Sequence, residues 1–225
     1  MLDLWKYSLD RDIVNCRACE RLTEYRKNIK KTPRHLHEDY WSLPLCGFGD
    51  QEAQLFIIGL APAAHGGNRT GRMFTGDQSG QWLTNSLYQT GFASQPTSMF
   101  KNDGLILYNA YISASIRCVP PENKPQGSEI HNCFPFLERE YLHLKNSIQV
   151  IVTLGGIAWK SFKALIKDQK LEMDFKHGNE CLIEGNKMWI SSYHPSRQNT
   201  NTKKLTWEMW IRIFRRAREF ICSLK

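Results

Sequence analysis

The sequence contains no apolar run of the roughly 18 residues that a membrane-spanning helix requires, so we expect no such helix. Its first residues, MLDLWKYSLDRDIV, place charged side chains among the apolar ones and lack the apolar core of a signal peptide. Both absences lead us to expect a protein of the reducing cytoplasm.

Two common phosphate-binding motifs are also missing. No G-x-x-x-x-G-K-[ST] loop occurs, and the one G-x-G, Gly47-Phe48-Gly49, lacks a third glycine and precedes a predicted strand. The usual nucleotide-cofactor loops are therefore excluded on spacing. The chain also lacks internal repeats and a linker of domain-boundary character, so we expect one domain over residues 1–225.

The composition is that of a packed globular protein with a basic surface. Hydrophobic residues make up 41% and aromatic residues 12% of the 225 residues, which argues against disorder. Lysine and arginine number 30 against 22 acidic residues, giving a net charge of +8. Such a balance favours solubility and permits a polyanionic partner, because basic side chains gain affinity by releasing counterions from phosphates.

Predicted strands and helices alternate along the chain. The strands are continuous apolar runs rather than alternating ones, which is typical of parallel strands buried on both faces. We therefore predict an α/β fold, a three-layer αβα sandwich with a central, mostly parallel sheet in a single domain. The predicted strands cover residues 55–61, 105–116 (with a kink), 150–155 and 188–194. The predicted helices cover residues 2–14 and 80–90, a segment capped by Ser128 and ending near residue 146, residues 156–167, and a last helix from about residue 205.

Two further features follow from the same pattern. The last helix places its large apolar side chains on one face, which predicts that this face is buried. Residues 26–37, RKNIKKTPRHLH, form a basic stretch that we interpret as a loop or a broken helix. Ligands of such sheets bind beyond the carboxyl ends of the strands, where polar segments follow Ala61 and Tyr193.

Seven cysteines are many for a chain in a reducing compartment, where metal binding or catalysis is commoner than disulfides. Four thiolates suit either a [4Fe–4S] cluster or a structural zinc, and a C-x-x-C pair supplies two ligands to one centre. The alternative is that the pair is accidental and the other cysteines are small buried apolar residues. The C-x-x-C pair is Cys16 and Cys19; the candidates downstream are Cys118 and Cys133, with Cys46, Cys181 and Cys222 as competitors.

The segment from residue 59 to residue 80, GLAPAAHGGNRTGRMFTGDQSG, is glycine-rich and lies between a strand and a helix. That position suits a phosphate or nucleobase site. For its aromatic side chain, Phe74, the alternatives are contact with a ligand and packing in the core. For its acid, Asp77, they are a chemical role and capping of the following helix. For Arg69 and Arg72, the alternative to a functional role is a solvated loop.

Three stretches together resemble one enzyme family. They are the A-P-A-A-H-G, N-R-T-G-R and F-T-G-D runs of residues 59–80, RCVPPENKP (117–125) and YHPSRQNTNTKKLT (193–206). With the paired cysteines, they are similar to the family 5 (type B) uracil-DNA glycosylases, and the resemblance runs from Cys16 to the last helix. It implies a monomeric, nucleoid-associated repair enzyme that hydrolyses the N-glycosidic bond of uracil, and of other deaminated bases, in DNA and leaves an abasic site.

The resemblance also implies roles for individual residues around the base. Asp77 would position or activate the attacking water, and Phe74 would stack on the flipped base. Asn123 would hydrogen-bond the base edge, His194 would face the base carbonyl, and backbone groups near Ala61 would line the pocket. Taken alone, a single histidine such as His194 is more often a structural residue.

Outside the base pocket, the resemblance implies a DNA contact and a metal cofactor. Residues 196–202 would enter the minor groove, and Arg197, beside Gln198 and Asn199, is the residue expected to fill the vacated space. The alternative for Arg197 is a contact with a phosphate. A [4Fe–4S] cluster would be held by Cys16, Cys19, Cys118 and Cys133.

The chain departs from other branches of the superfamily at two positions. They carry an acid or amide in the first motif, where this chain has Leu60-Ala61-Pro62, and an asparagine where this chain has Ala114. Because a site without a specific hydrogen-bond partner discriminates poorly, we expect a tolerant pocket that also accepts hypoxanthine. A non-catalytic DNA-binding or redox protein with a cysteine-ligated metal is the competing hypothesis.

Overall fold

The computed structural model describes residues 4–169 and 172–224, which form one six-stranded sheet in the order β1-β3-β2-β4-β6-β5. The four inner strands are parallel to one another, and each edge strand pairs antiparallel with its neighbour. The predicted mostly parallel sheet is thus confirmed. The strands are β1 (Phe48–Gly49), β2 (Leu55–Gly59), β3 (Ala110–Ala114), β4 (Val150–Leu154), β5 (Glu180–Ile183) and β6 (Lys187–Ser192).

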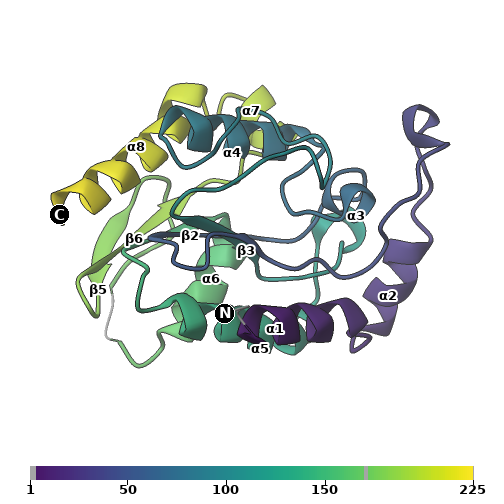
Figure 1. The fold of residues 1–225 in the computed structure, drawn as a ribbon, viewed down its shortest axis with the longest axis horizontal. Helices are drawn as coiled ribbons and strands as arrows, with labels where there is room; N and C mark the ends of the chain where they lie inside the picture. The colour runs from purple at the N-terminus through teal and green to yellow at the C-terminus, as the bar shows by residue number, and fades with distance from the viewer. Residues whose placement is uncertain (1–3, 170–171, 225) are drawn as a thin grey trace.

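Helices cover both faces of this sheet, which confirms the predicted αβα sandwich (Figure 1). Helices α4 (Gln78–Gln89) and α8 (Trp207–Ser223) lie on one face. Helices α5 (Gly127–Leu144) and α6 (Gly156–Leu165) lie on the other, with α1 (Leu4–Asn15) packed against α5.

Strand β2 explains why the inner strands read as continuous apolar runs. Leu55 and Ile57 belong to the core beneath α4 and α8, whereas Phe56 and Ile58 belong to the core beneath α5 and α6. All five residues of β2 are buried. Because neither face of the strand meets water, no alternation of polar and apolar residues is needed.

Helix α8 buries the face that its periodicity predicts. Its first turn is capped by Thr206, whose hydroxyl accepts a hydrogen bond from the Met209 amide at 3.3 Å. The buried residues include Trp210, Ile211, Phe214, Ala217 and Ile221, and Trp207 packs partly buried beside them. None of the described helices is both long and apolar enough to cross a membrane.

Three sequence-based predictions about the elements are wrong in detail. Ser128 does not cap α5: Gln126 is the cap, and it forms a reciprocal capping box with Glu129. The predicted strand 105–116 is ordered as strand only from Ala110, because Asn109 takes a positive φ of 52° that interrupts an extended chain. The predicted loop 196–202 contains a short helix, α7 (Arg197–Asn201).

The basic stretch 26–37 is mostly irregular. Its first residues end helix α2 (Glu20–Lys27), and a single 3₁₀ turn, η1 (Pro33–His35), follows. This part of the chain projects from the body of the molecule beside the short helix α3 (Gly67–Thr70) (Figure 1). The interpretation of this stretch as a loop or a broken helix is therefore confirmed.

Candidate active site

The two polar segments that follow β2 and β6 meet at the carboxyl end of the sheet. Ser79, in the first turn of α4, donates a hydrogen bond to the Pro195 carbonyl at 3.0 Å. Gln78 donates one to the Thr200 hydroxyl at 3.3 Å. The segment around His194 is thus docked onto the start of α4, as expected for a ligand site in a parallel sheet.

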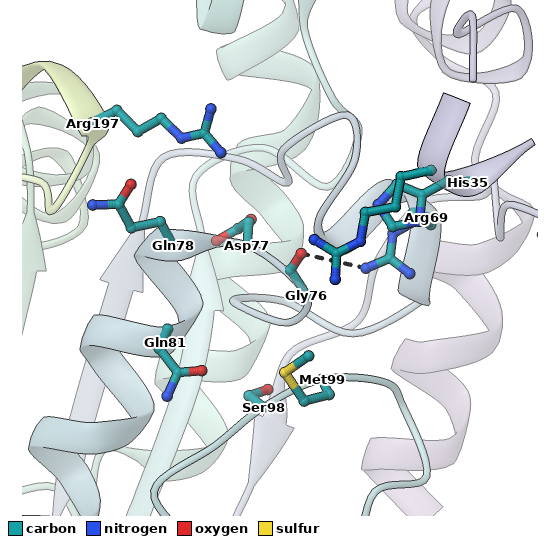
Figure 2. A pocket seen from close by; sticks show the side chains of 10 residues that line it. His35, Arg69, Gly76, Asp77, Gln78, Gln81, Ser98, Met99 and Arg197 are labelled. Carbon is teal, nitrogen blue, oxygen red and sulfur yellow. Dashed lines mark hydrogen bonds between the residues drawn. The ribbon is translucent and has the colours of Figure 1, made fainter. Parts of the chain in front are cut away.

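A cavity of about 270 Å³ opens beside this junction (Figure 2). Asp77 and Arg197 approach it from the α4 and α7 side, while Met99 points into it from the facing loop. The lining residues are Arg34, His35, Arg69, Gly76, Asp77, Gln78, Gln81, Ser98, Met99 and Arg197.

Asp77 is both the cap of α4 and a wall of the cavity. One carboxylate oxygen accepts a hydrogen bond from the Gly80 amide at 2.8 Å, so the capping interpretation is confirmed. Burial raises the pKa of Asp77, although the amides of Gly80 and Ser79 and the charge of Arg197 oppose this shift. The second oxygen is free of that cap, so capping does not exclude a chemical role.

Two glycines make room for the side chains of the predicted base site. A Cβ atom on Gly66 would lie 1.9 Å from the Asp77 Oδ2 atom. A Cβ atom on Gly59, at the end of β2, would lie 2.7 Å from the Phe74 ring. Because neither distance is compatible with a side chain, these glycines allow the segment to fold tightly over the strand.

Phe74 and His194 lie next to each other although they are far apart in sequence. Their ring centroids are 6.0 Å apart and their planes are tilted by 31°. Phe74 has a φ of 49°, a left-handed conformation that a bulky residue rarely adopts. Neither ring belongs to the lining of the cavity that contains Asp77, so the rings form a neighbouring surface.

The His194 ring is surrounded by protein but retains some solvent contact. Burial lowers its pKa to about 4, so the imidazole is neutral near pH 7. The Asn199 amide fixes the backbone here by donating to the His194 carbonyl at 2.8 Å. Within residues 4–169 and 172–224, no protein group hydrogen-bonds a ring nitrogen of His194, which leaves the ring available to a ligand.

Arg72 is a buried structural residue rather than part of a solvated loop. Its guanidinium donates to the Thr75 and Ser98 hydroxyls, both at 2.9 Å. It also forms a buried ion pair with Asp103 at 2.8 Å and donates to the Lys101 carbonyl at 2.9 Å. These contacts join the segment 59–80 to the loop 98–103.

Arg69 likewise holds its segment in place. It donates to the His65 carbonyl at 2.8 Å and to the Gly76 carbonyl at 3.3 Å (Figure 2), and it forms an ion pair with Glu38. The Tyr40 hydroxyl lies 3.0 Å from the His65 ring. Sequence reasoning missed these roles because the partners lie on other segments.

The remaining predicted site residues are distributed around this centre. Asn123 is exposed on the turn η2 (Pro121–Asn123), has a φ of 57°, and does not line the cavity. Ala61 packs against the apolar cluster that includes Cys118. Arg197 and Gln198 are exposed on α7. Asn199 is partly buried, and its side chain is occupied by the bond to the backbone of His194.

The four predicted metal ligands lie around a single small recess. Arg26 is fully buried beside it and donates from Nη1 to the Cys118 thiol at 3.1 Å, while its Nη2 has no hydrogen-bond partner among the described residues. Among residues 4–169 and 172–224, no three His, Cys, Asp or Glu side chains are arranged to share one metal ion. The four predicted ligands that line the recess are Cys16, Cys19, Cys118 and Cys133.

Comparison with known proteins agrees with this geometry. Residues 46–218 match the family described as Uracil DNA glycosylase superfamily. The chain is 42% identical to the Type-5 uracil-DNA glycosylase of Thermus thermophilus, over 92% of this chain and 94% of that protein. It is 39% identical to the Type-5 uracil-DNA glycosylase of Pyrobaculum aerophilum, over 91% of this chain and 88% of that protein. It is 40% identical to the Type-5 uracil-DNA glycosylase of Mycobacterium leprae, over 94% of this chain and 93% of that protein. The chain therefore belongs to the uracil DNA glycosylase superfamily and, within it, to the type-5 enzymes.

Proposed function

We propose that this protein removes uracil from DNA by hydrolysing the N-glycosidic bond and leaves an abasic site. The observation that carries the proposal is the position of Asp77. Its partly buried carboxylate lies on the wall of a cavity at the carboxyl end of the sheet, and Arg197 lines the same cavity. Phe74 and His194 lie next to each other in the adjoining segments. Family membership and this geometry support the same reaction.

Asp77 acts on the sugar and the water. Cleavage of the bond develops positive charge on the sugar and negative charge on the departing base. A carboxylate that orients a water molecule and faces a cationic sugar lowers the barrier without fully deprotonating that water. The free oxygen of Asp77 performs this task, while the other remains bound to the Gly80 amide.

His194 acts on the departing base. A neutral imidazole has one N–H donor, and we assign this donor to the base carbonyl, where negative charge grows in the transition state. Removing a single donor of this kind can cost about 3 kcal/mol of transition-state stabilisation. Phe74 supplies the aromatic face on which the base stacks, and Asn123 hydrogen-bonds the base edge from its exposed turn.

Helix α7 contacts the DNA backbone. Arg197 and Gln198 are exposed on α7, and Arg197 lines the cavity, where its guanidinium is suited to a phosphate. Asn199 supports this contact by holding the backbone of His194. DNA contact and the base site are thereby joined through one short segment.

The cofactor that we propose is a [4Fe–4S] cluster held by the four cysteines that share the recess, Cys16, Cys19, Cys118 and Cys133. Thiolates are the usual ligands of such clusters. A negatively charged thiolate cluster would also satisfy the otherwise unpartnered Nη2 of buried Arg26. When bound, the cluster would join helix α2 and the chain after β3 into one rigid unit.

The base specificity that we propose is broad. Ala114 is buried at the end of β3 and Ala61 packs near the cysteines, so neither position offers a side-chain partner for the uracil edge. A pocket without that partner should excise hypoxanthine as well as uracil. Release from matched duplexes that contain uracil, hypoxanthine or xanthine tests this, and strict selectivity for uracil would contradict it.

The test of the reaction is base release from uracil-containing duplex DNA, compared with Asp77→Asn. Asparagine caps helices as well as aspartate does, so the variant keeps α4 intact while removing the carboxylate. We expect turnover to fall at least about a hundredfold, the scale of losing one transition-state charge contact. DNA binding should persist. Binding by the unaltered protein without any release would favour the non-catalytic alternative.

A further inference from the structure

The loop 98–103 presents two large apolar side chains to solvent. Met99 is 50% exposed and Phe100 is 58% exposed. Met99 also lines the cavity, and it points into the space that Asp77 and Arg197 border from the other side (Figure 2). Phe100 directly follows Met99, which lines the cavity, so two exposed apolar side chains stand together beside the site.

This loop is held rigidly. The Asp103 carboxylate accepts hydrogen bonds from the amides of Met99 at 2.7 Å, Phe100 at 3.3 Å and Leu105 at 3.2 Å. That carboxylate is in turn paired with the buried guanidinium of Arg72. The apolar tip is therefore fixed relative to the cavity before any ligand arrives, so little ordering entropy is lost when it makes contact.

The surroundings of the tip are cationic. Arg34 and Arg197 border the same cavity, and exposed Lys101 follows Phe100 directly. The Lys101 ammonium lies 4.3 Å from the centre of the Trp41 ring, at the base of the loop. A pair of apolar side chains framed by cations matches duplex DNA, which offers a stack of bases between two rows of phosphates.

We propose that Met99 and Phe100 form a wedge that enters the base stack of duplex DNA beside the extruded nucleotide. The inference rests on the proposed function, because extrusion opens a gap and costs a few kcal/mol. Helix α7, which carries Arg197 and Gln198, offers no apolar side chain for such a gap. The wedge occupies it from the opposite side of the cavity, and Lys101 is placed to contact the adjoining phosphate.

The experiment compares the double variant Met99→Ala/Phe100→Ala with the unaltered protein on uracil in a duplex and in a single strand of the same sequence. A single strand has no paired stack to replace. We expect kcat/KM on the duplex to fall roughly tenfold, about the effect of losing one stacking contact. The single variant Phe100→Ala leaves the cavity lining unchanged, so its activity on the single strand should stay within about twofold, inside the variation of exposed substitutions. Met99→Leu/Phe100→Leu should retain duplex activity because it keeps an apolar tip.

The matched control is Leu142→Ala, which removes a side chain of similar exposure (51%) from α5 on the far face of the sheet. It should leave both activities unchanged. Equal losses of the double variant on duplex and single strand would indicate a distorted cavity and contradict the wedge. Unchanged activity on both would contradict it as well.

A second readout separates the wedge from the proposed reaction. In an Asp77→Asn background, 2-aminopurine placed next to uracil becomes fluorescent when the neighbouring base leaves the stack. The double substitution should reduce this signal on the duplex. If the protein bound DNA but released no base at all, the proposed reaction would fail, and the fluorescence would still decide whether the tip opens the stack.

Discussion

At the scale of single residues, Asp77 combines two requirements that conflict. As a helix cap, Asp77 accepts a hydrogen bond from the Gly80 amide. As a wall of the cavity, its carboxylate is largely buried. Burial raises its pKa above the ordinary value, so the folded protein holds an ionised carboxylate at neutral pH at some cost in stability. The free energy of unfolding should therefore rise as the pH falls through this raised pKa, because protonation removes the buried charge of Asp77.

We expect Asp77→Asn to be at least as stable as the unaltered protein at pH 7, because the cap remains and the buried charge is gone. The difference between the two should narrow in acid, where Asp77 becomes protonated. Urea unfolding at neutral and acidic pH measures it, with the exposed Asp174→Asn as control. A variant that is markedly less stable at pH 7 would show that Asp77 serves mainly the structure.

His194 has the opposite dependence on pH. Its pKa falls from the ordinary value of 6.5 to about 4 in the folded protein, whereas the unfolded chain binds the proton near the ordinary value. Stability should therefore be lost as the pH falls from 6.5 toward 4, by up to about 3 kcal/mol. His194→Gln should flatten this part of the pH profile, and the exposed His131→Gln should not. Equal slopes for both variants would contradict a buried neutral His194.

From the pattern of strands, the sequence predicted that the polar segments after Ala61 and Tyr193 lie at one edge of the sheet. The family resemblance, rather than spacing, assigned Asp77, Phe74 and His194 to one site. The sequence could not predict the roles of Arg69 and Arg72. Each guanidinium could as well be solvated, and the partners that bury them come from elsewhere, Glu38 before β2 and Asp103 after α4. Spacing along the chain carries no signal for such contacts.

At the scale of elements, the loop 98–103 and the segment 59–80 are joined by one buried ion pair. Arg72 and Asp103 have side-chain exposures of 8% and 5%, so removal of either leaves a buried charge without its partner. We expect Arg72→Met to lower the free energy of unfolding by about 3–5 kcal/mol, measured in urea. Arg139→Met breaks a pair exposed by 39% and 40%, and it should cost about 1 kcal/mol or less. A similar loss of unfolding free energy in both variants would contradict a structural role for the buried Arg72–Asp103 ion pair.

The elements that the sequence predicts correctly are those in which burial requires apolar residues at many successive or regularly spaced positions. Strands β2, β4 and β6 are continuous apolar runs, and α8 repeats its apolar face over several turns. Strands β1 and β5 were not predicted, because edge strands are short and only half covered. Helix α2 was missed for a related reason: it buries little beyond Leu22 and Arg26.

At the scale of the whole molecule, two distant parts of the chain converge on one recess. Cys16 and Cys19 lie between α1 and α2, Cys118 follows β3 and Cys133 lies in α5. The C-x-x-C pair was visible in the sequence. The other two cysteines could be selected only by family resemblance, because several cysteines compete and spacing does not distinguish them.

We expect the purified protein to be brown and to contain iron and acid-labile sulfide. Cys133→Ala should lose most of both and should unfold at lower denaturant concentration, because cluster binding contributes to folding. Cys222→Ala, which changes an exposed cysteine outside the recess, should keep its iron and its stability. Zinc without iron in the unaltered protein would overturn the cluster assignment.

The two antiparallel edges of the sheet have a consequence for contact between copies of the protein. An open, flat edge invites another copy to add its own strand. Here one edge is the two-residue β1, and the other, β5, begins at Glu180, whose carboxylate is paired with Arg216 of α8. Neither offers a long unpaired ladder. At both edges of the described sheet, the addition of a strand from a second copy is therefore disfavoured.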